Sequence, residues 1–137
     1  MSFVVDSSVA LGWIYIDEIT PATLQLSKRV NQSGAWVPAI WHLEIANSLQ
    51  TSVRSGRIDN TFRDKTLADL SLFKITTDSE MVERAWSSIL AITEQSGLTI
   101  YDACYIELAQ RRALPLATLD RDVRKAARAF DINLLST

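Results

Sequence analysis

Short apolar segments that alternate with helical segments constrain the fold of this chain most. Several segments have the length and composition of buried strands, and between them apolar residues recur at helical spacing. Strands that are apolar throughout are typical of a parallel sheet covered by helices on both faces. The sequence therefore predicts an α/β fold, a three-layer α/β/α sandwich with a central, mainly parallel sheet. The predicted strands are 2–5, 35–37, 115–119 and 132–135 with an edge strand at 74–77, and the predicted helices are 7–16, 20–32, 38–55, 59–73, 78–95, 99–112 and 120–130.

Four apolar runs of the chain end on a carboxylate, at Asp6, Glu44, Asp102 and Asp120. A carboxylate in such a place costs free energy unless a partner pairs with it. No Lys or Arg lies within three residues of the first three acids, so nearby ion pairs do not account for them. One metal site would explain all four acids, and this common explanation is stronger than the signal of any single acid.

Each acid also has an alternative role that needs no metal. Asp6 and Asp120 each lie between a predicted strand and a predicted helix, where aspartate commonly caps the helix. Asp102 follows Thr99 by three residues, as in a capping box, yet it heads an apolar stripe that should be buried. Glu44 lies in the middle of a predicted helix, where capping cannot explain it. Ligands bind at the carboxyl ends of parallel strands, which is where Asp6 and Asp120 fall.

Carboxylates from several segments are typical of a Mg²⁺ or Mn²⁺ site, because both ions prefer oxygen ligands. Such a site promotes in-line displacement at phosphorus and activates water without a histidine base. That suits this chain, because its one histidine, His42, has no partner at metal spacing and is interpreted as structural. Ser8 stands where a haloacid-dehalogenase-type phosphatase has its second aspartate, and four glycines form no phosphate loop.

The length of the chain, 137 residues, predicts a single domain over residues 1–137. A hydrophobic fraction of 47% and a charged fraction of 22% are ordinary for a globular protein. The single cysteine, Cys104, excludes an internal disulfide and a cysteine zinc cluster, and is interpreted as a small buried residue. The chain starts without a signal-peptide pattern and has no long apolar span, which favours a cytoplasmic location.

Four motifs follow one another along the whole chain. They are Val4-Val5-Asp6-Ser7-Ser8, then Pro38 through Asn47 around Glu44, then Tyr101-Asp102-Ala103, and finally Ala117 through Asp122 followed by Ala126-Ala127. In order and spacing they resemble PIN-domain nucleases and, within them, the VapC-like toxins of prokaryotic toxin–antitoxin systems. The resemblance implies a Mg²⁺- or Mn²⁺-dependent endoribonuclease that hydrolyses phosphodiester bonds in a structured RNA, such as tRNA or rRNA. It also implies a homodimer and a cognate VapB-like antitoxin that neutralises the enzyme.

The resemblance also assigns roles to individual residues. In the family the acids are both catalytic and metal-binding. For Thr118, the alternative to the role given below is that it is simply a strand residue. The assigned residues are Asp6, Glu44 and Asp102 as core metal ligands, Asp120 as the fourth acid, Asp122 as its replacement or assistant, Thr118 as the hydroxyl residue beside that acid, and Ser7 and Asn47 as residues that orient ligands or water.

The net charge of −2, from 14 basic and 16 acidic residues, argues weakly against nucleic-acid binding by itself. If four acids bind metal, the 16 acids fall to 12 and the basic residues are in excess. Basic residues gather late in the chain, where Arg121, Arg124 and Lys125 are candidates for contacts with an RNA backbone. A solvated helix face is the alternative explanation. The late basic residues also include Arg111, Arg112 and Arg128.

A second hypothesis is a catalytically silent PIN-like module that binds RNA or protein. The intact set of acids argues against it. The aromatic residues could also contact RNA by base stacking, but packing in the core or at a dimer surface is the preferred interpretation. The tryptophans concerned are Trp13, Trp36, Trp41 and Trp86.

Overall fold

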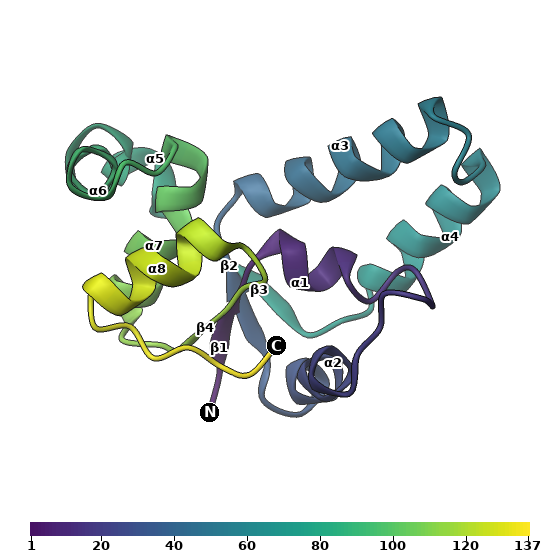
Figure 1. The fold of residues 1–137 in the computed structure, drawn as a ribbon, viewed down its shortest axis with the longest axis horizontal. Helices are drawn as coiled ribbons and strands as arrows, with labels where there is room; N and C mark the ends of the chain where they lie inside the picture. The colour runs from purple at the N-terminus through teal and green to yellow at the C-terminus, as the bar shows by residue number, and fades with distance from the viewer.

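The sheet at the centre of the molecule is parallel throughout, with strand order β3-β2-β1-β4 (Figure 1). The computed structural model describes residues 1–137, and every strand pair in it runs in the same direction. The predicted α/β fold with a parallel sheet is therefore confirmed. The strands are β1 (Phe3–Val5), β2 (Ala35–Val37), β3 (Ile75–Thr77) and β4 (Leu116–Ala117).

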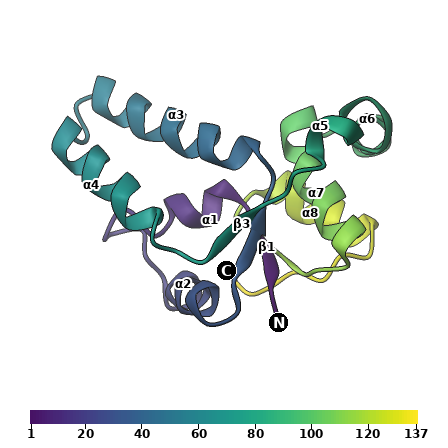
Figure 2. The same ribbon diagram turned by 180° about the vertical axis from the view of Figure 1, so that it is seen from behind.

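Helices cover both faces of the sheet. Helices α7 and α8 lie on one side, α1 and α2 lie on the other, and α3 and α4 form an antiparallel pair that extends away from the sheet (Figures 1 and 2). The helices are α1 (Ser7–Leu11), α2 (Pro21–Ser33), α3 (Ile40–Arg54), α4 (Asn60–Leu70), α5 (Met81–Arg84), the π-helical segment η1 (Ala85–Ile89), α6 (Leu90–Ser96), α7 (Ile100–Arg112) and α8 (Arg121–Ala129).

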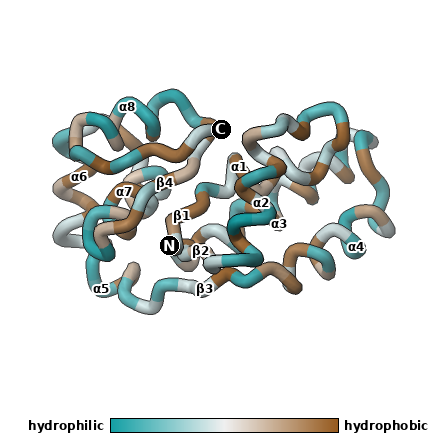
Figure 3. Tube along the Cα trace, turned by 90° about the horizontal axis from the view of Figure 1, so that it is seen from below, coloured by the Kyte–Doolittle hydropathy of each residue, from teal (hydrophilic) through white to brown (hydrophobic).

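The core is built around β1, which Figure 3 shows as a hydrophobic segment in the middle of the molecule. All three residues of β1 are fully buried, as a central strand between two helical layers requires. Helix α7 packs against β1 and β4 and buries an unbroken run from Ala103 to Ala109. Cys104 lies in that run, so its prediction as a small buried residue is confirmed.

The first helix is shorter than predicted. It ends at Leu11, whereas the apolar pattern predicted a helix over residues 7–16. Beyond it, the Trp13 indole N–H donates to the carbonyl of Thr23 at 2.8 Å, and its ring stacks on Phe73 with centroids 5.2 Å apart. These long-range contacts bury apolar side chains after Leu11 without a helix. The apolar residues over 12–16 therefore did not indicate a longer helix.

Two further elements differ from the sequence prediction. The helix predicted over 78–95 begins at Met81, because Asp78 is buried in an ion pair with Arg111, and its middle is the π-helical segment η1. The strand predicted over 132–135 is reduced to one parallel bridge between Leu116 and Leu134.

The tryptophans lie in different environments. Trp41 is buried, and Trp13 and Trp36 pack half-buried against the core. Trp86 is 93% exposed, so of its two predicted environments the core is excluded, and a dimer surface stays a prediction. None of the helices combines the length and the apolar character that a membrane crossing requires.

Candidate active site

The candidate site lies where β1 and β4 end side by side. These strands pair in parallel with Val5 opposite Ala117, and the backbone N–H of Asp6 donates to the carbonyl of Ala117 at 2.9 Å. The residues that follow each strand are therefore neighbours, which places Asp6 beside Thr118. This is the edge at which the sequence predicted a site.

Asp6 is a buried carboxylate held by hydroxyl groups, with 4% of its surface exposed. Its Oδ2 accepts from Thr118 Oγ1 at 2.6 Å and from Ser8 Oγ at 2.8 Å. Its side chain makes no capping hydrogen bond to α1, so the capping alternative is wrong for Asp6. Burial raises the pKa of Asp6 above its usual value despite these hydrogen bonds, and the charge of Asp120 raises it further.

The two hydroxyl groups that hold Asp6 are themselves fixed by the backbone. Thr118 Oγ1 accepts from the N–H of Asp120 at 3.1 Å, and Ser8 Oγ accepts from the N–H of Leu119 at 3.0 Å. Each hydroxyl proton is therefore free to point at Asp6. The resemblance assigned Thr118 to the site, and in the structure the Thr118 hydroxyl contacts Asp6. Ser8 was missed, although a hydroxyl two residues after a strand-end aspartate is a recognisable signal.

Glu44 faces Asp6 from the first half of α3. Its Oε1 accepts from the Tyr105 hydroxyl at 2.5 Å and from Ser7 Oγ at 3.3 Å, while Ser7 Oγ also lies 3.4 Å from Asp6 Oδ1. Ser7 thus bridges two of the predicted ligands. Burial raises the pKa of Glu44, and the charge of Asp6 adds to the effect.

Tyr105 is a site residue that sequence reasoning missed. Its position in the buried stripe of α7 gave it the appearance of a core residue, and its side chain is fully buried. Burial raises the pKa of the phenol well above its usual range, so Tyr105 remains a donor to Glu44. A polar hydroxyl three residues after Asp102 on the same face was the available signal.

Asp102 adds a third carboxylate from the first turn of α7. Its backbone N–H donates to Thr99 Oγ1, but its carboxylate makes no hydrogen bond in return, so no capping box forms. Burial raises the pKa of Asp102 to about 6, and the charges of Asp120, Asp6, Glu44 and Asp122, in that order, contribute. All the predicted acids are thus close enough to act on this one group.

Asp120 plays the capping role that was its alternative in the sequence. Its Oδ1 accepts from the N–H groups of Asp122 and Val123, at 2.9 and 3.0 Å, and so caps α8. Its Oδ2 has no hydrogen-bond partner in the protein. A cap at one oxygen and a ligand role at the other are therefore compatible, and Asp122 lies exposed in the first turn of the same helix.

Several predicted supporting residues make no hydrogen bond or ion pair with the four acids. Asn47 makes no hydrogen bond to them and instead lines a cleft beside Ser8. The Arg124 NH1 group donates to the Thr118 carbonyl and to Thr137 Oγ1, at 3.0 and 3.2 Å, so internal contacts occupy it. Arg121 and Lys125 are exposed, and Lys125 lines a second cleft of about 590 Å³ that also contains Asp102.

The donor set fits a hard divalent cation. Its members offer carboxylate and hydroxyl oxygens, and no ion pair of the structure involves Asp6, Glu44, Asp102 or Asp120. As the side chains stand, no three His, Cys, Asp or Glu residues converge closely enough to hold one ion.

Replacing Asp102 by asparagine should stabilise the protein when divalent cations are absent. Because the folded-state pKa is raised from 3.8 to about 6, this group costs no folding free energy below the lower value and costs most above the higher one. We expect Asp102→Asn to gain about 1–3 kcal/mol near pH 8 in EDTA, and almost nothing near pH 3, below both pKa values. Urea denaturation at both pH values measures this. An equal gain at both would contradict the electrostatic explanation.

Comparison with known proteins identifies the family that this fold and acidic site define. The PIN domain family matches residues 3–129, and the chain belongs to that family. It is 35% identical over 102 residues to a protein named Exonuclease VapC9 from Pyrobaculum aerophilum, an alignment that covers 71% of this chain and 73% of the relative. The predicted resemblance to VapC-like PIN proteins is thus confirmed.

Two solved structures share the fold. The structure of FitAcB from Neisseria gonorrhoeae superposes with a TM-score of 0.69 at 14% identity, over 99% of this chain and 97% of the other. A toxin–antitoxin complex from Klebsiella pneumoniae superposes with a TM-score of 0.59 at 18% identity, over 88% of each chain. At these identities the likeness concerns the arrangement of the chain alone.

Proposed function

We propose that this protein is a Mg²⁺- or Mn²⁺-dependent endoribonuclease, and the toxin of a toxin–antitoxin pair. One observation carries the proposal. Four carboxylates from four segments gather at the carboxyl edge of β1 and β4 without a cationic partner, and burial raises the pKa values of Asp6, Glu44 and Asp102. A protein that keeps three destabilised carboxylates together gains from a ligand that neutralises them.

The cation would be held by Asp6, Glu44, Asp102 and Asp120. Asp122 could replace or assist Asp120. Bound there, Mg²⁺ or Mn²⁺ supplies Lewis acidity toward a phosphodiester and activates a water. Ser8 and Thr118 fix the orientation of the Asp6 carboxylate, and Tyr105 and Ser7 position Glu44. Such partners restrict the orientations that the Asp6 and Glu44 carboxylates can adopt.

The proposed biological role is based on the proteins to which this chain is similar. The protein shares its fold with a toxin–antitoxin complex from Klebsiella pneumoniae, and its relative in Pyrobaculum aerophilum bears a VapC name. We therefore propose that a VapB-like antitoxin neutralises this chain, that it forms a homodimer, and that it acts in the cytoplasm on tRNA or rRNA. Light scattering of the purified protein tests the homodimer.

Cleavage of total cellular RNA by the purified protein tests the activity, with Mg²⁺ or Mn²⁺, with EDTA, and with Glu44→Gln. We expect discrete fragments that require both the metal and Glu44, with activity reduced about 10²-fold or more in the variant. A circular RNA separates the two modes of cleavage, because only an endonuclease opens it. Degradation of linear RNA alone would match the exonuclease name of the relative.

A catalytically silent binding module is the second candidate. The observation that favours it is that the acids do not converge on one point as the side chains stand. No cleavage in any metal, by a folded protein freed of antitoxin, would support this second function.

A further inference from the structure

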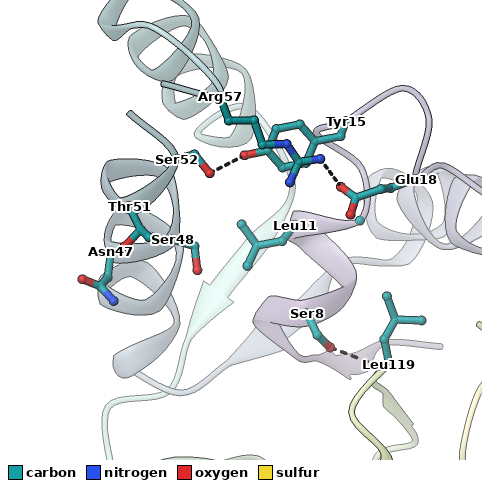
Figure 4. A pocket seen from close by; sticks show the side chains of 11 residues that line it. Ser8, Leu11, Tyr15, Glu18, Asn47, Ser48, Thr51, Ser52, Arg57 and Leu119 are labelled. Carbon is teal, nitrogen blue, oxygen red and sulfur yellow. Dashed lines mark hydrogen bonds and ion pairs between the residues drawn. The ribbon is translucent and has the colours of Figure 1, made fainter. Parts of the chain in front are cut away.

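A cleft of about 660 Å³ lies beside the acids, between α1 with the turns that follow it and the second half of α3 (Figure 4). Three of its 11 lining residues are hydrophobic, and hydroxyl groups dominate the rest. Ser8 and Leu119 belong to its wall, and Ser8 also donates to Asp6, so the cleft lies next to the site.

A polar stripe along α3 connects the cleft with Glu44. Asn47, Ser48 and Thr51 lie three, four and seven residues after Glu44, which places all four on one face of the helix. Figure 4 shows the Ser48 side chain on the side of α3 that faces Leu11, and none of Asn47, Ser48 and Thr51 makes a side-chain hydrogen bond within the protein. Seven residues of helix span about 10 Å, so the stripe carries unused donors and acceptors away from the acids.

A guanidinium group supplies the positive charge of this cleft. The Arg57 guanidinium carbon lies 3.6 Å from the centroid of the Tyr15 ring, and its NH2 group pairs with Glu18 at 3.3 Å. The Tyr15 hydroxyl shares a hydrogen bond of 2.8 Å with Ser52 Oγ, which fixes the ring beneath Arg57 (Figure 4). The Arg57 side chain remains 48% exposed, so it is both oriented and accessible.

We propose that this cleft binds the nucleotide next to the scissile phosphate of a single-stranded RNA, an inference that rests on the proposed function. Arg57 contacts a backbone phosphate, and the free groups of Asn47, Ser48 and Thr51 contact ribose and phosphate oxygens. A hydroxyl-lined wall suits the 2′-hydroxyl of RNA, whereas a peptide would need larger apolar pockets as anchors.

Binding without cleavage tests the cleft directly. The background is Glu44→Gln in EDTA, and the probe is a fluorescent random-sequence single-stranded RNA of about ten nucleotides, compared with DNA of the same length. We expect Arg57→Gln to weaken RNA binding about tenfold and to reduce its salt dependence. Arg57→Lys should retain the salt dependence, and Ser48→Ala with Thr51→Val should narrow the preference for RNA over DNA.

Arg54→Gln is the matched control, because Arg54 is an exposed cation at the end of α3, three residues before Arg57 and outside the cleft. RNA affinity that falls equally in Arg54→Gln and Arg57→Gln would overturn the proposal, and so would unchanged affinity in Arg57→Gln. If Arg57→Gln lost binding to the antitoxin but kept full RNA affinity, the proposal would also be overturned, and the cleft would be assigned to a protein partner.

The two proposals fail in different ways. RNA binding that depends on Arg57, with no cleavage in any metal, would refute the nuclease and leave the cleft as an RNA site. Metal-dependent cleavage in which Arg57→Gln changes neither KM nor RNA affinity would support the nuclease and refute the cleft. In the active protein we expect Arg57→Gln to raise KM several-fold with little change in kcat.

Discussion

Replacing Asp6 by asparagine should abolish RNA cleavage while the protein remains folded. Asp6 is the most buried of the acids, and it ends the central strand β1, so its position is the least adjustable in the site. Loss of a residue that merely supports a metal ligand costs about 10–100-fold in activity. Loss of the ligand charge itself should cost more, in rate and in the Mg²⁺ concentration needed for half-maximal activity.

The fold should tolerate this change because an amide satisfies the same partners. The asparagine oxygen can accept from Ser8 and Thr118 as the Asp6 Oδ2 does, and its NH2 group can donate to Ser7 Oγ. Burial and the charge of Asp120 raise the pKa of Asp6, so its ionised form destabilises the metal-free fold. In EDTA at neutral pH, Asp6→Asn should therefore melt at a higher temperature than the unmodified protein.

Thermal denaturation with and without Mg²⁺ measures this, beside cleavage assays. Asp17→Asn serves as the control, because Asp17 is an exposed aspartate in the turns after α1. We expect Mg²⁺ to raise the melting temperature of the unmodified protein and of Asp17→Asn, but to have little effect on Asp6→Asn. Full activity in Asp6→Asn, or an unfolded variant, would exclude the proposed role of Asp6.

The position of the site could be predicted from sequence because it depends on local signals. Asp6 and Asp120 each follow an apolar strand, and in a parallel sheet such ends meet at one edge. Which hydroxyl groups hold the acids could not be predicted in the same way. Ser8 lies near Asp6 in sequence, but Tyr105 reaches Glu44 across 61 residues, and its buried stripe was equally typical of a core.

The elements that differ from prediction are those whose ends depend on distant residues. The helix after β3 starts late because Asp78 pairs with Arg111, 33 residues further along the chain. Trp86 carried the same composition signal as the packed Trp41, yet only the three-dimensional arrangement leaves its ring exposed. Arg124 belongs to a group of basic residues whose clustering predicted RNA contacts, whereas in the structure its side chain hydrogen-bonds to Thr118 and Thr137. Periodicity contains no information about such contacts.

Replacing Arg111 by methionine should destabilise the fold by about 3–5 kcal/mol, because it leaves the buried carboxylates of Asp78 and Glu107 with only the longer ion pairs to Arg112 and Arg84, at 3.4 and 3.9 Å. The guanidinium binds Asp78, Glu80 and Glu107 at 2.7, 2.9 and 2.7 Å. The carboxylates of Asp78 and Glu107 are 1% and 5% exposed. Burial alone would raise the pKa of Asp78, but hydrogen bonds from Arg111 and Arg112 and the charge of Arg111 outweigh it and lower that pKa.

The loss should depend on pH with a definite sign. Since the folded-state pKa of Asp78 is lowered, its pairing with Arg111 contributes stability above the unfolded-state value of 3.8 and loses it as the pH falls through the folded-state value. In Arg111→Met the unpaired acids take up protons instead, so the difference between the two proteins should narrow from pH 7 toward pH 3. Urea denaturation across that range measures the difference.

Arg128→Met is the matched control, because Arg128 is an exposed cation in the last turn of α8. It should change the free energy of unfolding by less than about 0.5 kcal/mol. Arg111 connects the segment before α5 with α7, the helix that also carries Asp102 and Tyr105. Its role is to stabilise the fold, so Arg111→Met should lower activity only where it lowers the folded fraction. Equal stability of Arg111→Met and Arg128→Met at neutral pH would mean that Arg111 is not needed to neutralise these acids, since Arg112 and Arg84 also pair with them.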